Sequence, residues 1–193
     1  MKRIFALVLI GMMMLAALAA AEPAQAPTFE DFAGLEWMFT SGAGAWYTTL
    51  EIGADGTFTG SFHDSEMGDA GDDFPYGSVY GCLFHGRMTM GEQVNAYTWS
   101  VHVDELELDE GQVPEAIEEG IRYVTSEPYG IKAGIDMQLY LPGTPVSELP
   151  EDFLFWAHLI GEEAEALPYY GLYDVEGDAG FVGIMAQEDN QVG

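Results

Sequence analysis

Hydrophobic and polar residues alternate with a period of two over much of the chain from Trp37 onward. That period is typical of β-strands that bury one face. The segments 45–52 and 57–64 each place their large apolar side chains on a single face. Pairing Ile52 with Phe58 keeps both apolar faces together. It leaves Ala54, Asp55 and Gly56 as a three-residue loop in which Gly56 supplies the left-handed residue, so the sequence predicts a β-hairpin here.

The same alternation predicts strands at 79–90, 96–108, 121–125, 136–141, 169–175 and 180–186, with a turn at 91–95. One short helix is predicted from Pro150 to His158, with Ser147 as its cap and Glu151 and Asp152 in its first turn. Consecutive short strands without βαβ alternation predict a mainly β protein. We expect an antiparallel up-and-down barrel of about eight strands, with a β-sandwich as the alternative.

The first residues indicate export. Met1, Lys2 and Arg3 precede an apolar run that ends in Ala19-Ala20-Ala21, the pattern of a cleaved secretory signal peptide. We therefore expect a signal peptide at 1–21, a flexible leader at 22–33, one barrel domain at 34–186 and a disordered tail at 187–193. An uncleaved run would instead serve as a membrane anchor. The localisation predicted is secreted or extracellular.

The charge is strongly one-sided. The chain has five basic and 33 acidic residues, a formal net charge of −28, and removal of 1–21 leaves only Arg87, Arg122 and Lys132 as bases. Such a surface repels phosphate, which argues against nucleic acid or an anionic membrane surface as a partner. Salt adaptation, cation binding and simple solubility all explain the acidity, and the sequence leaves the oligomeric state open.

Two resemblances emerge from short motifs. The segments 41–46, 55–60, 63–68 and 141–150 are similar to an uncharacterised family of exported proteins from Firmicutes, which implies an address and a fold but no activity. The segments 44–47, 54–56 and 59–62 resemble the first two strands of avidin-like barrels. Thr48, Phe62 and Asp64 stand where that family has Asn, Tyr and Ser, so the resemblance implies a barrel without biotin binding.

A hollow barrel would place a small-molecule cavity among inward side chains. The residues predicted to line it are Trp46, Thr48, Phe62, Tyr80 and Trp99. Aromatic residues of this kind more often form the core of a β protein.

Two metal sites are considered. Pairing His85 with His102 across the strands 79–90 and 96–108 would bring two imidazoles together, with His63 nearby, as Zn²⁺ requires. The acidic loop that carries Asp64, Glu66, Asp69, Asp72 and Asp73 would suit Ca²⁺. The alternative in each case is a solvated polar surface that binds no metal. Of the two ions, the sequence favours Ca²⁺.

No catalytic motif is present. The chain lacks the G-x-S-x-G, H-E-x-x-H and phosphate-loop patterns. Cys82 and His85 lie three residues apart on one strand and so face opposite sides, which makes Cys82 a buried apolar residue rather than a nucleophile. We expect a non-enzymatic module that binds a small molecule, a cation or a cell-surface partner. A secreted hydrolase that uses two carboxylates, as glycosidases do, is the alternative.

Overall fold

The computed structural model describes residues 26–185, so the predicted signal peptide at 1–21 and tail at 187–193 lie outside it. Ten strands form one sheet. Their bounds are β1 Leu35–Thr40, β2 Trp46–Ile52, β3 Thr57–Glu66, β4 Ser78–Asn95, β5 Thr98–Leu108, β6 Glu115–Glu118, β7 Ile121–Thr125, β8 Asp136–Tyr140, β9 Tyr170–Asp174 and β10 Ala179–Met185. The helical elements are η1 Phe29–Phe32, η2 Val146–Glu148 and α1 Glu151–Trp156.

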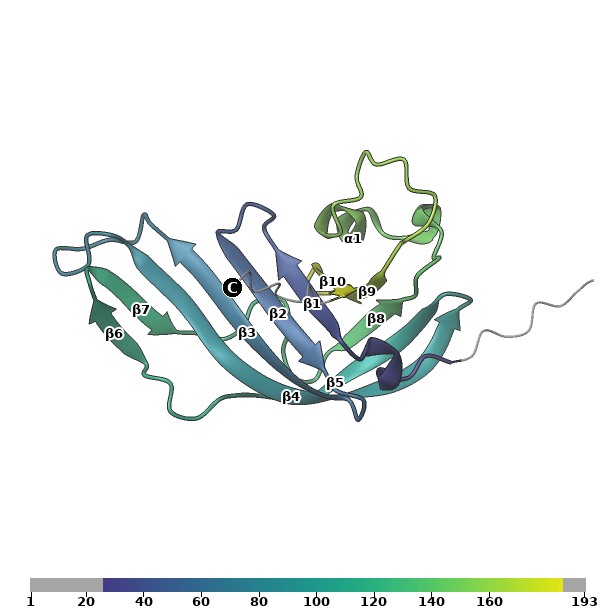
Figure 1. Cartoon of the computed structure of the whole chain (residues 1–193), viewed down its shortest axis with the longest axis horizontal. Coiled ribbons are helices and arrows are strands. Elements are labelled where there is room, and N and C mark those ends of the chain that lie inside the picture. Colours follow the sequence, from purple (N-terminus) through teal and green to yellow (C-terminus); the bar gives the residue numbers. More distant parts are fainter. Residues whose placement is uncertain (1–25, 186–193) are drawn as a thin grey trace, which may run out of the picture.

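Eight of these strands close into an antiparallel barrel. Strands β1 to β5 pair in chain order, β8, β9 and β10 continue the sheet, and β10 pairs with β1 to close it (Figure 1). Neighbours in the chain are therefore neighbours in the barrel, which is the up-and-down arrangement. The predicted fold is confirmed, and the sandwich alternative is not what forms.

The hairpin predicted between β2 and β3 is also confirmed. Ile52 lies opposite Phe58, and Gly56 adopts φ +80° in the connecting loop. A side chain at Gly56 would collide with the carbonyl oxygen of Met88 at 2.4 Å. The turn is thus fixed both by its left-handed residue and by β4 passing beneath it.

The barrel interior is packed with side chains. Its core contains fully buried aromatic and aliphatic residues from almost every strand of the barrel, among them Trp37, Phe39, Leu50, Phe84, Trp99, Val103, Leu139, Leu172 and Phe181. Trp46 and Phe62 are partly buried against the same cluster. The common apolar lining expected from the alternation therefore exists, and it is filled by the protein itself.

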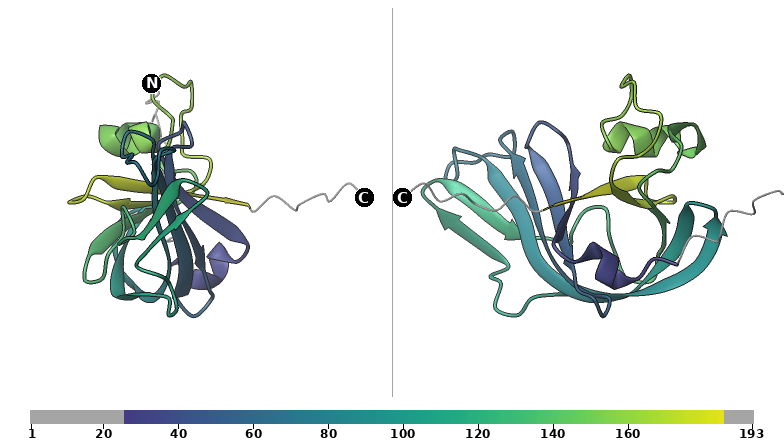
Figure 2. Two further views of the ribbon diagram at one scale, coloured as in Figure 1. Left: turned by 90° about the vertical axis from the view of Figure 1, so that its left-hand side faces the viewer. Right: turned by 45° about the vertical axis from the view of Figure 1, so that its right-hand side comes forward.

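A second, smaller core lies outside the barrel. Helix α1 packs Phe153 against Tyr140 and Tyr173 of β8 and β9. Figure 2 shows from two sides that the helix lies outside the barrel. The helix is shorter than predicted. The predicted cap, Ser147, is wrong, because Pro150 is the N-cap residue and no side chain caps the helix. Ser147 lies in η2 instead, because a proline separates it from the helix.

The end of the predicted flexible leader belongs to the barrel domain. Residues Phe29–Phe32 form η1, and Phe32 is buried against Trp37 and Tyr170 with ring centroids 5.3 Å from each. Aromatic burial of this size outweighs the cost of ordering one turn. The sequence pattern missed this because the segment is too short to show a period.

Strand β4 is longer than predicted, which changes its register with β5. The segment 91–95, expected as a turn, continues β4 as far as Asn95. Irregularities after Arg87 and after Met90 shift the pairing, so that Met88 opposes Val103 and Met90 opposes Val101. The apolar faces still match, which the alternation requires, but by a different pairing from the one predicted.

Candidate functional site

The five residues predicted to line an interior cavity instead form the wall and the core. Trp99 is buried in the core, and Trp46 packs against Phe39 with ring centroids 4.8 Å apart. The Thr48 hydroxyl, fully buried, donates to the Tyr129 carbonyl at 2.7 Å. Phe62 joins the barrel core and Tyr80 donates to the Asp69 carboxylate. None of the five lines the three depressions that we compare on the described residues.

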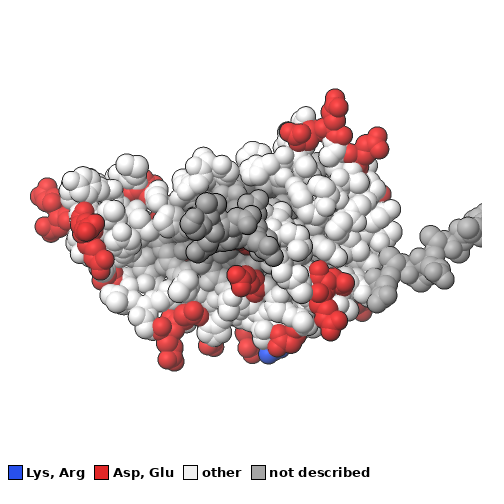
Figure 3. All heavy atoms as spheres, in the orientation of Figure 1, with Lys and Arg blue, Asp and Glu red and all other residues white. Residues whose placement is uncertain are grey.

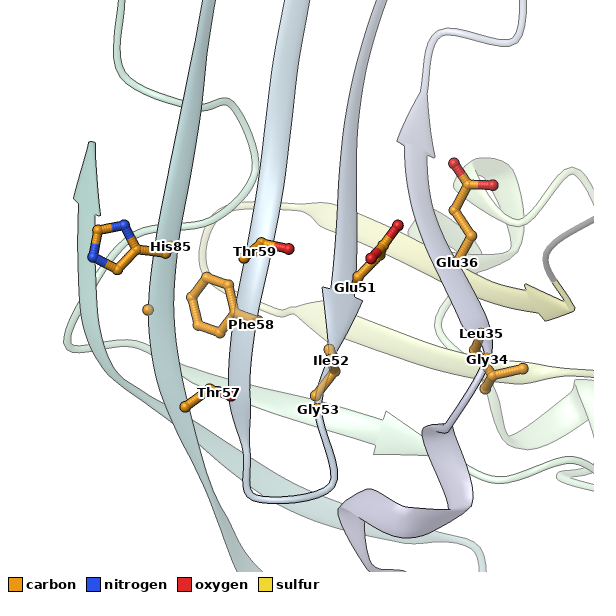
Figure 4. Close-up of a pocket in the computed structure, with 11 residues that line it drawn as sticks. Gly34, Leu35, Glu36, Glu51, Ile52, Gly53, Thr57, Phe58, Thr59 and His85 are labelled. Carbon is orange, nitrogen blue, oxygen red and sulfur yellow. The ribbon is translucent and has the colours of Figure 1, made fainter. Parts of the chain in front are cut away.

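The largest of these depressions lies across strands β1 to β4, beside the β2–β3 turn. Its volume is about 700 Å³, within the usual range for small-molecule sites. It is lined by the polar residues Glu36, Glu51, Thr57, Thr59 and His85, the apolar residues Leu35, Ile52 and Phe58, and three glycines (Figure 4). We call it the β1–β4 depression.

Two carboxylates face each other at this site. Glu36 of β1 is the direct partner of Glu51 of β2. The bond from Ser41 N to Trp46 O sets the alternation of the ladder, which makes Glu36 and Glu51 a non-hydrogen-bonded pair with Cβ atoms about 5 Å apart. Neither carboxylate has a salt-bridge or hydrogen-bond partner among residues 26–185. Like charges placed directly opposite destabilise a sheet, so the arrangement works against folding stability.

An oriented imidazole lies at the far side of the depression. His85 of β4 is the direct partner of Thr59 of β3, and Thr59 in turn is the partner of Glu51. Asp109 bonds to Nδ1 of His85 at 2.7 Å. A carboxylate at Nδ1 holds the proton there, which leaves Nε2 of the neutral ring as an acceptor.

A smaller hollow of about 240 Å³ continues the site along the outer face. It shares Glu51 and Thr59 with the larger one, and it also includes Asp109. Thr49 and Ser61 join their hydroxyl groups at 2.9 Å on its wall. The polar groups of this whole region are therefore carboxylates, hydroxyls and one imidazole nitrogen, a set dominated by acceptors.

No positive charge on the described residues balances these groups directly. Arg87 lies nearest in sequence, but its guanidinium donates to the Asp55 carbonyl at 3.3 Å, in the β2–β3 turn. On the face shown in Figure 3, acidic side chains occupy the ends and the lower margin, and basic ones barely appear. The depression therefore lies in a field of negative potential.

The predicted histidine cluster does not form. His85 opposes Glu107 and His102 opposes Thr89, because β4 runs on beyond Met90 and moves the register. His102 bonds to Asp136 at 2.7 Å, and His63 stacks on Tyr47 and bonds to Ser65. The pairing of His85 with His102 is thus wrong, and each imidazole has its own local partner.

The acidic loop is likewise divided. Asp64 lies within β3, and Glu66, at its end, accepts a bond from Gly68 N at 2.9 Å. Asp69 forms an ion pair with Arg122, while Asp72 and Asp73 are exposed. Across residues 26–185, no three His, Cys, Asp or Glu side chains are grouped closely enough to hold a metal ion.

The shifted carboxyl groups offer no acid suited to general acid catalysis. The Thr57 hydroxyl and backbone amide lower the pKa of Asp55. The Tyr80 hydroxyl and then other neighbours, Arg122 among them, lower the pKa of Asp69. A carboxyl that must donate a proton near neutral pH needs its pKa raised instead. Cys82 is 6 % exposed and burial raises its pKa to about 11, as expected for a thiol in the core.

Comparison with protein-family models, with curated proteins and with solved structures finds no significant match to this chain. Both resemblances noted from short motifs therefore remain predictions. Within residues 26–185, no helix is both long and apolar enough to cross a bilayer.

Sequence reasoning missed Glu36 and Glu51, the most unusual residues of the site. Their opposition depends on the pairing of β1 with β2, and the alternation of apolar and polar residues alone does not delimit β1. A signal was present: once Ser41 to Ala45 is taken as a turn, matching the apolar residues Trp37 and Leu50 places Glu36 opposite Glu51.

Proposed function

We propose that the protein is a non-enzymatic binding module that takes up a small organic cation in the β1–β4 depression. The observation that carries this proposal is the directly opposed, unpartnered pair Glu36 and Glu51 at the β1–β4 depression. An ammonium or guanidinium group between the two carboxylates would remove their repulsion and form charge-assisted hydrogen bonds. Ligand binding would thereby stabilise the folded protein.

The other groups of the depression fit the same ligand class. The imidazole Nε2 of His85 and the hydroxyl of Thr59 add acceptors on the side away from Glu36. Leu35 packs against the barrel core and borders the same space where the depression reaches the end of the barrel. A packed barrel interior is consistent with binding on the outer face instead.

Calorimetric titration with phenethylamine tests this proposal. The amine should bind the wild-type protein, and 2-phenylethanol, which has the same shape without the charge, should not. The double variant Glu36→Gln/Glu51→Gln should bind the amine roughly tenfold more weakly, because it removes two charge-assisted contacts to the ammonium group, each with a contribution of up to about 1 kcal/mol.

The matched control is Glu110→Gln/Glu118→Gln, which changes the net charge equally at two exposed glutamates outside the depression. This control should bind as the wild type does. If both double variants lose affinity to the same extent, the interaction is with the overall charge, and the assignment of the site is wrong.

A further inference from the structure

The hairpin of β6 and β7 lies outside the closed barrel. The barrel is complete without it, since β5 continues directly to β8 in the sheet. Instead β7 runs parallel to the first residues of β4, from Ser78 to Gly81, and β6 forms the outermost strand of the sheet (Figure 1). The chain thus builds a short sheet extension that barrel closure does not require.

The extension is held firmly in place. Arg122 of β7 forms an ion pair with Asp69, and its Nε donates to the Ser78 hydroxyl at 3.0 Å. The same guanidinium lies over the ring of Phe74, 4.6 Å from its centroid. One of the few basic residues of the chain is therefore used to anchor this hairpin to the loop between β3 and β4.

The outer edge of β6 presents free backbone groups. The bond from Thr125 N to Pro114 O sets the ladder of β6 and β7. By the alternation of an antiparallel pair, Ala116 and Glu118 bond to β7, whereas Glu115 and Ile117 turn their N–H and C=O groups outward. Residues Glu119 and Gly120 have φ +50° and +81°, which is the tight turn that keeps such a hairpin regular.

The side chains around this edge combine apolar surface with negative charge. Ile117 is 46 % exposed and Tyr123 41 % exposed. Glu115, Glu118 and Glu119 are exposed as well, and the one arginine of the hairpin is already engaged by Asp69. A second copy of the chain would bring like charges together at this edge, while a basic strand would be attracted to it.

We propose that the β6 edge binds an extended peptide segment of a partner protein in which basic and apolar residues alternate. The segment adds an antiparallel strand through the outward N–H and C=O groups of Glu115 and Ile117. Its basic side chains meet Glu118 on one face of the hairpin, and its apolar side chains cover Ile117 on the other, because neighbouring residues of a strand point to opposite faces. This interaction uses a surface separate from the β1–β4 depression and does not depend on it.

Titration of the full chain with a short capped peptide that alternates lysine with valine tests the proposal. The peptide should bind the wild-type protein, and the same peptide N-methylated at alternate residues should bind roughly tenfold more weakly, because its inward amides can no longer donate. A peptide with glutamate in place of lysine should not bind. Failure of the lysine peptide to bind, or equal binding by the methylated one, overturns the proposal.

The variant Ile117→Pro locates the site. Proline removes only the outward N–H and keeps the bonds of Ala116 and Glu118 to β7, which is the position where an edge strand tolerates it. The variant Ile117→Pro should no longer bind the peptide. The variant Ile117→Thr keeps the N–H, and its affinity for the peptide should lie within about threefold of that of the wild type. Unchanged circular dichroism shows that the hairpin persists. If Ile117→Pro binds the peptide as well as the wild type does, the proposal is wrong. It is also wrong if the wild-type protein forms dimers through this edge and Ile117→Pro dissociates them.

Discussion

Thr48 and Tyr129 are joined by a hydrogen bond of 2.7 Å between residues 81 positions apart in the chain. The hydroxyl lies inside the barrel wall, fully buried on β2, and the carbonyl belongs to the segment between β7 and β8. Tyr129 also contacts Trp46, with ring centroids 5.0 Å apart. This segment therefore closes one end of the barrel, and the polar group of Thr48 serves the fold rather than a ligand.

Replacing Thr48 with valine should destabilise the protein by about 1–3 kcal/mol, because the fully buried Thr48 loses its hydrogen bond and the Tyr129 carbonyl loses its donor. Urea denaturation followed by tryptophan fluorescence measures the change. The control Thr59→Val removes a hydroxyl of an exposed residue and should change stability by less than about 0.5 kcal/mol. Equal effects for the two would mean that the buried bond contributes nothing.

Replacing Gly171 with alanine should destabilise the packing of α1 on the barrel by about 1–3 kcal/mol. A Cβ atom there would lie 2.3 Å from Cζ of Phe153, and all its nearest neighbours belong to that ring. Phe153 is fully buried and cannot move aside freely. In a double-mutant cycle, Phe153→Leu should relieve the collision, so that the two changes together cost less than their sum. Strict additivity would contradict this account.

Cys82 should react slowly with Ellman's reagent at pH 8 in the native state. Burial raises its pKa to about 11, so only about one thiol in a thousand is ionised at that pH. In denaturant the thiol becomes exposed, and it should react at the rate of a free cysteine. Rapid labelling of the native protein would show that the thiol is accessible and that the strand carrying it opens.

The contribution of Asp69 to stability should disappear in acid. Its pKa in the folded protein is lowered, first by the Tyr80 hydroxyl and with a further contribution from Arg122. A carboxyl with a lowered pKa stabilises the fold above its unfolded pKa of about 3.9, and this stabilisation is lost as pH falls through the folded value.

We therefore expect wild-type protein to melt at a higher temperature than Asp69→Asn above about pH 5. The difference between their midpoints should shrink steadily below about pH 4. Melting both proteins in parallel cancels the general effect of protonating the other acidic residues. If the difference between the two melting midpoints stays constant into strong acid, the charge of Asp69 is not the reason for its effect on stability.

The residue pattern from Trp46 to Val103 was sufficient to predict a barrel. Alternation with a period of two assigns each side chain to a face of its strand. The short loop around Gly56 then fixes the register of the first hairpin, in which Ile52 lies opposite Phe58. The pairing of β4 with β5 could not be predicted in the same way. Slips of two residues keep the same face buried, and the irregularities in β4 leave no clear mark in the sequence.

The amino-acid sequence by itself determined the strand faces, the first hairpin and the lopsided charge, because these depend on neighbours in the chain and on composition. Only the tertiary structure decided that the interior is filled, that His85 and His102 lie apart, and that Glu36 meets Glu51. Closure of the sheet and the choice of register depend on how all the side chains pack together. That packing arises from contacts between segments that are distant in the chain, so a local sequence pattern cannot predict it.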